Sequence, residues 1–269
     1  MPAALNVITI KLLAIPNATQ ITANGINDHG QVVGQFTDQQ GVAHGFVYEQ
    51  GSFCQVDYPG MSDVNLYKIN NLGQFVGSIR DSAGTIHGFF FDHGTLSHPL
   101  SHPGAGATYA SGINDRGEIV GTYYQAGASH AFIYTAGSFS APNLPGAQQT
   151  GFQAINDAGL AVGIAVDAKG THGIVYLESA GLFVPPFDFP GASVTYPQAI
   201  NADGQIGGQY TLPAGNGLPF VSLAGSLVSV NIPGAKEASI LGLNGRGQIC
   251  GNFIDAQKVH HSYIAALAI

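Results

Sequence analysis

One short segment of the sequence carries polar side chains that could do acid–base chemistry. Asp63, Asn65, Tyr67 and Lys68 lie close together, and Arg80 follows, in a chain of which only 9% of the residues are charged. A lysine held near an arginine and away from water loses its charge more readily, which suits a general base or a partner for a carbonyl group. A neighbouring tyrosine can donate a proton. We therefore expect Lys68, Tyr67 and Arg80 to be catalytic, and Asp63 and Asn65 to bind substrate.

Other residues depart from the pattern of their positions and are expected to join the same site. His102 stands directly before a proline, where related positions carry apolar residues, and is the fourth expected catalytic residue. The remaining expected substrate-binding residues are Tyr109, Phe152, Gln153, Tyr196, Gln198 and Glu237. No glycine-rich phosphate loop, serine nucleophile motif or metal-ligand spacing accompanies them. We expect cofactor-free, metal-independent chemistry on a small molecule, such as proton transfer, elimination, cyclisation, isomerisation or hydrolysis.

The segments that would position these residues belong to an internal repeat. An asparagine recurs six times at spacings of 43, 44, 42, 45 and 43 residues, with a glycine three and seven residues later and a proline eleven residues earlier. Lys68 stands two residues before the second asparagine, where the other copies have glycine or alanine. The asparagines are Asn27, Asn70, Asn114, Asn156, Asn201 and Asn244, and the small residues are Gly25, Gly112, Ala154, Ala199 and Gly242.

Each copy predicts four short antiparallel strands, because glycine-containing turns such as "NDHG" separate short apolar runs. Four strands in 40 to 45 residues have the dimensions of a β-propeller blade. The last copy lacks its fourth strand, and the segment at about 5–15 ends in a proline that aligns with those after the other fourth strands. We predict an all-β, six-bladed β-propeller, one domain over 1–269, in which this N-terminal strand completes the blade at about 233–269 and closes the ring.

A histidine occupies one position of five copies, at the start of the third strand. A ring of blades would keep these side chains too far apart to share one metal ion. Aspartates in the preceding loops are the expected partners, so we interpret the histidines as structural. The histidines are His44, His87, His130, His172 and His261, and the aspartates are Asp38, Asp81, Asp167 and Asp255.

Composition excludes several classes of partner. The net charge is −8 with only eight lysines and arginines, which argues against nucleic acid and against an anionic membrane surface. Cys54 and Cys250 fall at non-equivalent points of the repeat and are expected to be free thiols. The start of the chain lacks a basic leader before its apolar run. We therefore expect a cytoplasmic protein, or a secreted one if a leader was removed, with a monomer favoured.

The unit "GINDxGxIVGxYxDxxGxxHGF" resembles the bacterial HAF-type repeat, named for a tripeptide that stands here at His130, Ala131 and Phe132. The resemblance covers nearly the whole chain. It implies a β-propeller, often in surface or exported proteins, and it implies no shared catalytic residues. The fifth copy departs from the motif at Leu218, Pro219 and Phe220.

The sequence leaves open a structural propeller that docks a partner through its edge, and two functions with ligand sites. The first is an enzyme with a single small-molecule site in the funnel around the central channel, which the irregular second copy favours. The second is a non-catalytic module that binds carbohydrate or protein at repeated sites between blades. Repetition favours the second, although sugar sites commonly use tryptophan and the chain has none.

Overall fold

Short antiparallel strands form nearly all the regular structure in the computed structural model, which describes residues 4–213 and 215–268. These residues contain one short 3-10 helix, η1 (Glu178–Ala180), and no α-helix. The predicted all-β class is confirmed. The strands are β1 (Leu5–Leu12), β2 (Gln20–Ile26), β3 (Val32–Thr37), β4 (Ala43–Glu49), β5 (Ser52–Val56), β6 (Ser62–Ile69), β7 (Phe75–Arg80), β8 (Ile86–Asp92), β9 (Thr95–Leu96), β10 (Ala107–Ile113), β11 (Ile119–Gln125), β12 (Ala128–Thr135), β13 (Ser138–Ser140), β14 (Gln149–Ile155), β15 (Leu160–Asp167), β16 (Gly170–Leu177), β17 (Leu182–Phe187), β18 (Val194–Ile200), β19 (Ile206–Thr211), β20 (Gly217–Leu223), β21 (Ser226–Asn231), β22 (Ala235–Leu243), β23 (Gln248–Asp255) and β24 (His260–Leu267).

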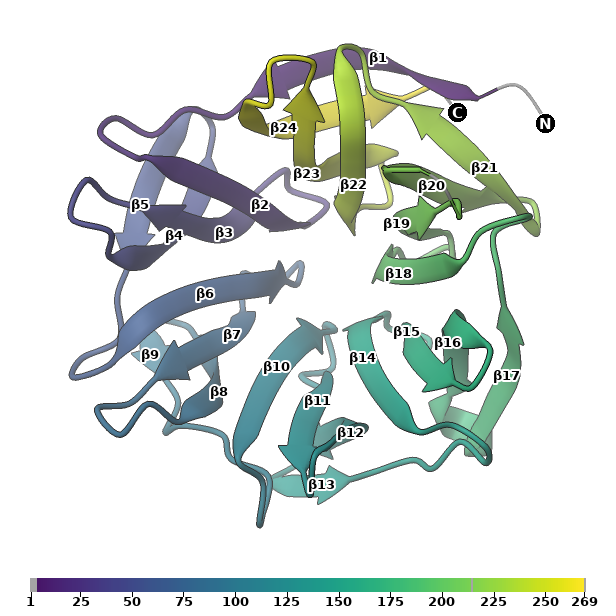
Figure 1. Ribbon diagram of the computed structural model, residues 1–269. Helices are drawn as coiled ribbons and strands as arrows, with labels where there is room; N and C mark the ends of the chain where they lie inside the picture. Colours follow the sequence, from purple (N-terminus) through teal and green to yellow (C-terminus); the bar gives the residue numbers. More distant parts are fainter. Residues whose placement is uncertain (1–3, 214, 269) are drawn as a thin grey trace.

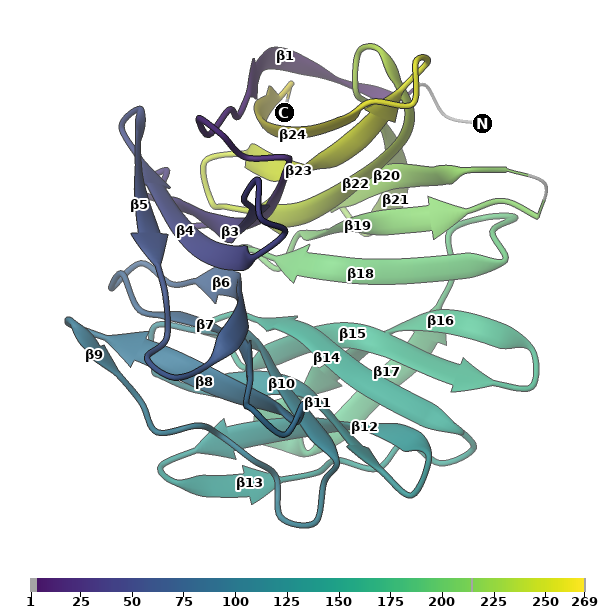
Figure 2. The same cartoon turned by 60° about the vertical axis from the view of Figure 1, so that its left-hand side comes forward.

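Consecutive strands pair antiparallel in runs, such as β2 to β5 and β6 to β9. The last run is β22 to β24, and β1 pairs antiparallel with β24, with Leu12 opposite Tyr263. Short parallel contacts between runs join the strands into sheets of 12, 8 and 4 strands. The runs are arranged around a central axis, and β1 lies beside β24 (Figure 1). The view in Figure 2 shows the runs one above another.

The first strand of each run lies nearest the axis (Figure 1), and we call these six the inner strands. They are β2, β6, β10, β14, β18 and β22. Each contacts the inner strands on either side of it, including the first and the last in the chain, β2 and β22. The inner strands therefore determine which side chains reach the axis.

Large side chains fill the space between neighbouring runs, and the second glycine of the repeat makes room for them. Phe46 and Phe89 are fully buried on the third strands of their runs. A Cβ on Gly34 would lie 2.8 Å from the ring of Phe46 and 1.9 Å from the carbonyl oxygen of Thr22. Such overlaps exclude any side chain at this position, which explains why glycine recurs seven residues after each asparagine.

The repeated asparagines form a closed circle of hydrogen bonds, which we call the asparagine circle. The side-chain amide of each donates to the backbone carbonyl of the asparagine in the next unit, and Asn244 donates to Asn27 at 2.9 Å, joining the last unit to the first. The Oδ1 atom of Asn27 also accepts the backbone N–H groups of His29 and Gln31. One buried side chain thus organises its own turn and links two units.

The expected histidine–aspartate partners are confirmed in four units. The Nε2 atom of His87 lies 2.9 Å from Asp81, and that of His261 lies 2.8 Å from Asp255. The same contact joins His44 to Asp38 and His172 to Asp167. The loop before His130 carries no aspartate, and this ring packs at 5.1 Å from the ring of Tyr123. In these four units the histidine links the third strand to the preceding loop.

Candidate functional site

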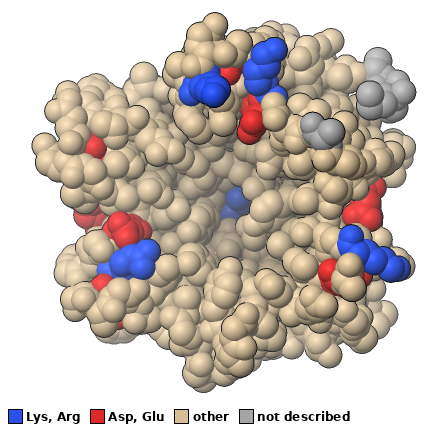
Figure 3. Space-filling model, in the orientation of Figure 1, with Lys and Arg blue, Asp and Glu red and all other residues tan. Residues whose placement is uncertain are grey.

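A cavity of ≈ 320 Å³ opens on the axis at one face of the molecule, and we call it the central cavity. Figure 3 shows the hollow at the centre of this face, with a Lys or Arg side chain at its base. Lys68 is the single charged residue among those that line the cavity in the described part of the chain. The lining residues are Asn24, Tyr67, Lys68, Tyr109, Ser111, Thr122, Tyr124, Ser129, Gly151, Gln153, Ile164, Tyr196, Gln198 and Leu241.

A β-bulge at the same place in every inner strand builds this cavity. Each inner strand skips one residue in its pairing with the second strand, three positions before the asparagine. A bulge re-aims the extra side chain and leaves its backbone groups out of the ladder. The six unpaired residues all line the central cavity, and they are Asn24, Tyr67, Ser111, Gln153, Gln198 and Leu241.

Lys68 directly follows one of these bulges. Its ammonium nitrogen donates to the backbone carbonyl of Asn24 at 2.9 Å and to that of Leu241 at 2.8 Å. Both acceptors are bulge residues, so their carbonyls are available to the lysine. Burial lowers the pKa of Lys68 to about 8, while the thiol of Cys250 opposes this shift. Lys68 also lines a smaller cavity of ≈ 50 Å³ farther along the axis, whose other lining residues are isoleucine, leucine, alanine and glycine, so it forms the base of the central cavity.

Four tyrosines supply the aromatic part of the wall, namely Tyr67, Tyr109, Tyr124 and Tyr196. The hydroxyl of Tyr67 hydrogen-bonds to the hydroxyl of Ser78 at 2.9 Å, and burial raises the pKa of Tyr67 to about 12. Burial likewise raises the pKa of Tyr109 and of Tyr196. The phenols of Tyr67, Tyr109 and Tyr196 therefore stay protonated at neutral pH and can donate hydrogen bonds.

The acidic and basic pair of the second unit lies in a neighbouring side cavity of ≈ 270 Å³. Arg80 donates to Asp63 at 2.6 Å, and this carboxylate raises the pKa of the guanidinium. Asn65 lines the same cavity and accepts from the amide of Asn24 at 2.9 Å. Tyr67 and Tyr109 line both cavities and form the wall between them. Arg80, Asp63 and Asn65 are therefore adjacent to the central cavity and not in its lining.

The structure brings six of the expected site residues into the central cavity. They are Lys68, Tyr67, Tyr109, Gln153, Tyr196 and Gln198. Three others lie outside both cavities, which corrects the expected common pocket. Phe152 is fully buried and packs against Tyr176 and Phe183, because alternation along a strand turns it away from the side of Gly151 and Gln153.

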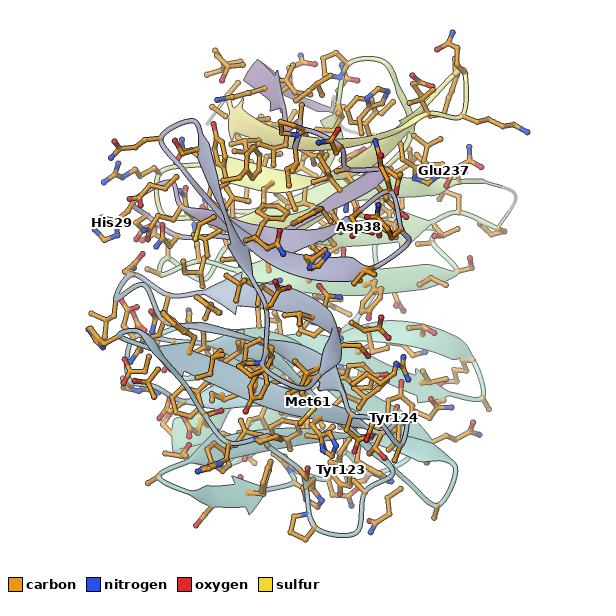
Figure 4. The ribbon with its side chains drawn as sticks, turned by 90° about the vertical axis from the view of Figure 1, so that its left-hand side faces the viewer. His29, Asp38, Met61, Tyr123, Tyr124 and Glu237 are labelled. Carbon is orange, nitrogen blue, oxygen red and sulfur yellow. The ribbon has the colours of Figure 1, made fainter. Side chains whose placement is uncertain are left out.

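His102 occupies a structural position. Its ring stacks on Tyr123 at 3.6 Å, and Phe189 stacks on Tyr210 at the same distance in the fifth unit. The imidazole therefore replaces a packing aromatic ring. Glu237 lies at the outer end of β22, opposite Ile254. Figure 4 shows Glu237 and Tyr124 towards one side of the molecule and His29 on the other, so Glu237 is on the expected face but outside the cavity.

Several lining residues were not expected from the sequence. They are Asn24, Ser111, Thr122, Tyr124, Ser129, Gly151, Ile164 and Leu241. A signal for three of them was present, since Asn24, Ser111 and Leu241 share the register of Tyr67, Gln153 and Gln198, three residues before the repeated asparagine. The other five could not be predicted, because the sequence does not show which face of each strand is turned towards the axis.

Within the described ranges, no group of three or more His, Cys, Asp or Glu side chains is placed to hold a metal ion. Over the same ranges, no helix is long and apolar enough to cross a membrane. The described atoms include one buried side-chain acceptor without a partner, the Oε1 atom of Gln198 in the wall of the central cavity.

Several solved structures are similar to this chain over most of its length. TolB from Acinetobacter baumannii matches with a TM-score of 0.61 and 9% identity, over 89% of this chain and 64% of that one. The β-propeller domain of the Trilobed protease from Pyrococcus furiosus matches with a TM-score of 0.59 and 13% identity, over 93% and 82%. A variant of the Aleuria aurantia lectin, in complex with Fucα1-6GlcNAc, matches with a TM-score of 0.54 and 10% identity, over 96% and 97%.

The fold is a β-propeller. At these identities the likeness concerns the fold alone, and this chain spans only about 64% of the length of the TolB protein. No protein-family model matches the sequence, and no curated protein sequence matches it either.

Proposed function

We propose that this chain is a single-site, small-molecule-binding β-propeller whose ligand occupies the central cavity. The observation that carries the proposal is Lys68, a charged side chain at the base of the cavity in a position where every other unit has glycine or alanine. The cavities between units are not equivalent to one another. The side cavity contains Asp63 and Arg80, whereas a cavity beside β1 and β24 is lined by Gln20 and His261 among others. Such asymmetry favours one site.

The finer description of the fold belongs to the same proposal. We interpret the strand runs as six four-stranded blades, with β1 as the outer strand of the last blade and the asparagine circle as the element that links the blades. The pairing of β1 with β24 and the bond from Asn244 to Asn27 support closure of the ring. We further propose membership of the HAF-type repeat proteins on the repeat motif.

Within this site we propose cofactor-free acid–base chemistry. Lys68 is the proposed base, because its lowered pKa makes the neutral amine accessible near neutral pH. Tyr67 is the proposed proton donor, held by Ser78. Arg80, with its partner Asp63, would act from the side cavity on the part of a ligand that reaches past Tyr109. His102 and Phe152 contribute packing, and Glu237 takes no role in the cavity.

The alternative is a non-catalytic module that binds carbohydrate or protein at repeated sites. The lectin with a similar fold supports it, since that protein is described with a bound disaccharide. Repeated sites require similar side chains in each unit. The repeated polar side chains here, the histidines and the asparagines, are already paired within the protein.

Ligand stoichiometry separates the two functions. Native mass spectrometry of the whole chain after incubation with a bacterial small-molecule extract should show one ligand per chain. Lys68→Met should lose the ligand with its folding intact by circular dichroism. Lys169→Met, at an exposed lysine on another unit, is the matched control and should retain it. Several ligands per chain, held equally by Lys68→Met, would support the repeated-site module.

A further inference from the structure

The central cavity carries a positive charge that the protein does not balance. Lys68 is charged when protonated, and no Asp or Glu is among the residues that line the cavity in the described chain. None of the ion pairs between described residues includes Lys68. Asp63, an acidic side chain of the expected set, is paired with Arg80 in the side cavity.

The hydrogen bonds of Lys68 leave one donor for a ligand. An ammonium group has three N–H donors. Two are directed to the carbonyls of Asn24 and Leu241. These neutral acceptors orient the ammonium group but do not neutralise its charge, and the third donor is left for an occupant of the cavity.

The fold does not require this charge. The equivalent positions of the other units hold Gly25, Gly112, Ala154, Ala199 and Gly242, and their inner strands form the same bulge. A cation removed from water without a counter-ion is costly. A counter-ion that arrives with the ligand would offset this cost.

The other residues that line the central cavity indicate which groups a negatively charged ligand should carry besides its charge. The hydroxyls of Tyr109, Tyr124 and Tyr196 make no hydrogen bond within the described residues and can donate to a second ligand oxygen. Gln198 Oε1 has no partner and can accept from a ligand hydroxyl after rotation of its amide. The volume of ≈ 320 Å³ is at the lower end of small-molecule pockets, roughly 300–1,000 Å³.

We propose that the ligand of the central cavity is a small hydroxylated organic acid whose carboxylate pairs with Lys68 and whose body lies among the tyrosine rings. This rests on the proposed single site and names its substrate class, and it assigns Lys68 in the bound state as the cation that holds the carboxylate, in place of the proposed role as base. A phosphate ester fits less well, because no arginine and no helix N-terminus lines the cavity, and these are the groups that suit a dianion.

Paired probes test the assignment. Mandelate and 4-hydroxybenzoate, with mandelamide and 4-hydroxybenzamide as uncharged partners, are titrated into the whole chain by isothermal calorimetry. Each acid should bind in one copy and at least about tenfold more tightly than its amide, a difference of about 1.4 kcal/mol. Lys68→Met should abolish this preference, and Lys169→Met should keep it. Crystals soaked in sodium bromide should show bromide beside the Lys68 nitrogen.

The outcomes distinguish this inference from the proposed function. Amides that bind in one copy as tightly as the acids, or an acid preference that survives in Lys68→Met, would overturn the acid class and leave the single site. Absence of acid binding together with absence of bromide at Lys68 would also overturn it. Probes found in several cavities between units, and not in the central cavity, would overturn the proposed function itself.

Discussion

The nitrogen of Lys68 lies 2.8 Å from the carbonyl oxygen of Leu241, a residue 173 positions later in the chain. Leu241 is the unpaired residue of the bulge in β22, so its carbonyl is outside the ladder of its own sheet. The bulge that shapes the cavity therefore also supplies the acceptor that orients the charged group in it. This contact joins a repeated feature, the bulge of the inner strand, to a residue that breaks the repeat, Lys68.

Replacing Lys68 with Met should change how stability depends on pH. Burial holds the pKa of Lys68 near 8, below its ordinary 10.5, so between these values the unfolded chain binds a proton that the folded chain has released. The free energy of unfolding of the wild type should therefore rise with pH through this window relative to the variant, by about 3 kcal/mol.

Denaturant titrations of both proteins at pH 7, 8, 9 and 10.5 measure this effect. Tyr67 and Cys250 are titratable groups close to Lys68. Both have pKa values of about 12 in the folded protein, so both stay neutral over this pH range. Below pH 8 the difference between the two proteins should be constant. A difference that is also constant from pH 8 to 10.5 would show that Lys68 is solvated in the folded protein.

Asn244→Asp should weaken the link between the last unit and the first. The substitution keeps the oxygen that accepts the N–H groups of Arg246 and Gln248, but it removes the amide that donates to the carbonyl of Asn27. A buried carboxylate would then face a carbonyl, at a cost of roughly 2 to 3 kcal/mol. Thermal and urea unfolding measure the loss. Asn143→Asp, at an exposed asparagine, should change stability by less than about 0.5 kcal/mol; equal effects of the two would remove the asparagine circle as a stabilising element.

The strands and turns of this protein could be predicted from its sequence because each repeated residue has a local task. Asn27 and its equivalents cap a turn, and Gly34 excludes a Cβ between a backbone oxygen and a phenylalanine ring. These requirements are met within one unit or between adjacent units, so the repetition itself reveals them. Lys68 could be selected as a candidate because the other units have glycine or alanine at its position. Small residues suit this position because the backbones of neighbouring inner strands approach closely there, as at Gly25, where a Cβ would lie 2.7 Å from the carbonyl oxygen of Tyr67.

The remaining errors concern the face to which a side chain turns. Phe152 and Gln153 are neighbours in sequence, yet the strand and its bulge direct Phe152 into the core and Gln153 to the axis. His102 looked functional because histidine is unusual before that proline, but its ring stacks on Tyr123 as the ring of Phe189 stacks on Tyr210 in the fifth unit. Residue type alone does not distinguish stacking from catalysis, so geometry was needed.

His172→Gln should destabilise the protein more at acidic than at alkaline pH. Hydrogen bonds with Asp188 first and Asp167 second raise the pKa of His172 above 6.5, although burial opposes this. A raised folded pKa gives stability that is fully present below pH 6.5 and is lost as pH rises through the folded value. The loss should be roughly 1 kcal/mol or less at pH 5.5, because the pair is partly exposed, and smaller at pH 8.5.

Urea titrations at these two pH values give the comparison for His172. Asp188→Asn removes the first partner and should reproduce part of the acid-side loss. His29→Gln, at an exposed histidine on the opposite side from the cavity (Figure 4), is the control and should leave stability unchanged. A loss at His172 of the same size at both pH values would assign the side chain to packing alone.

Removal of residues 1–12 should expose the edge of β24 and destabilise the whole protein. The deletion takes away the pairing of β1 with β24 and the packing of Leu5 and Val7 on the cluster that contains Val230 and Leu267. An uncovered edge strand promotes association between chains. We expect a loss of more than about 3 kcal/mol, and oligomers in size-exclusion chromatography with light scattering.

A synthetic peptide with the sequence of residues 4–15, added in trans, should restore the monomer and most of the thermal stability. The reason is that β1 acts through hydrogen bonds and packing, which do not require a covalent link to the rest of the chain. The double variant Ile8→Ser and Ile10→Ser is the matched control. Both side chains are exposed, at 69% and 37%, so their loss should leave stability nearly unchanged. A truncated chain that is monomeric and as stable as the full chain would show that β1 is not needed to hold the first and last units together, and that contacts such as the bond from Asn244 to Asn27 suffice.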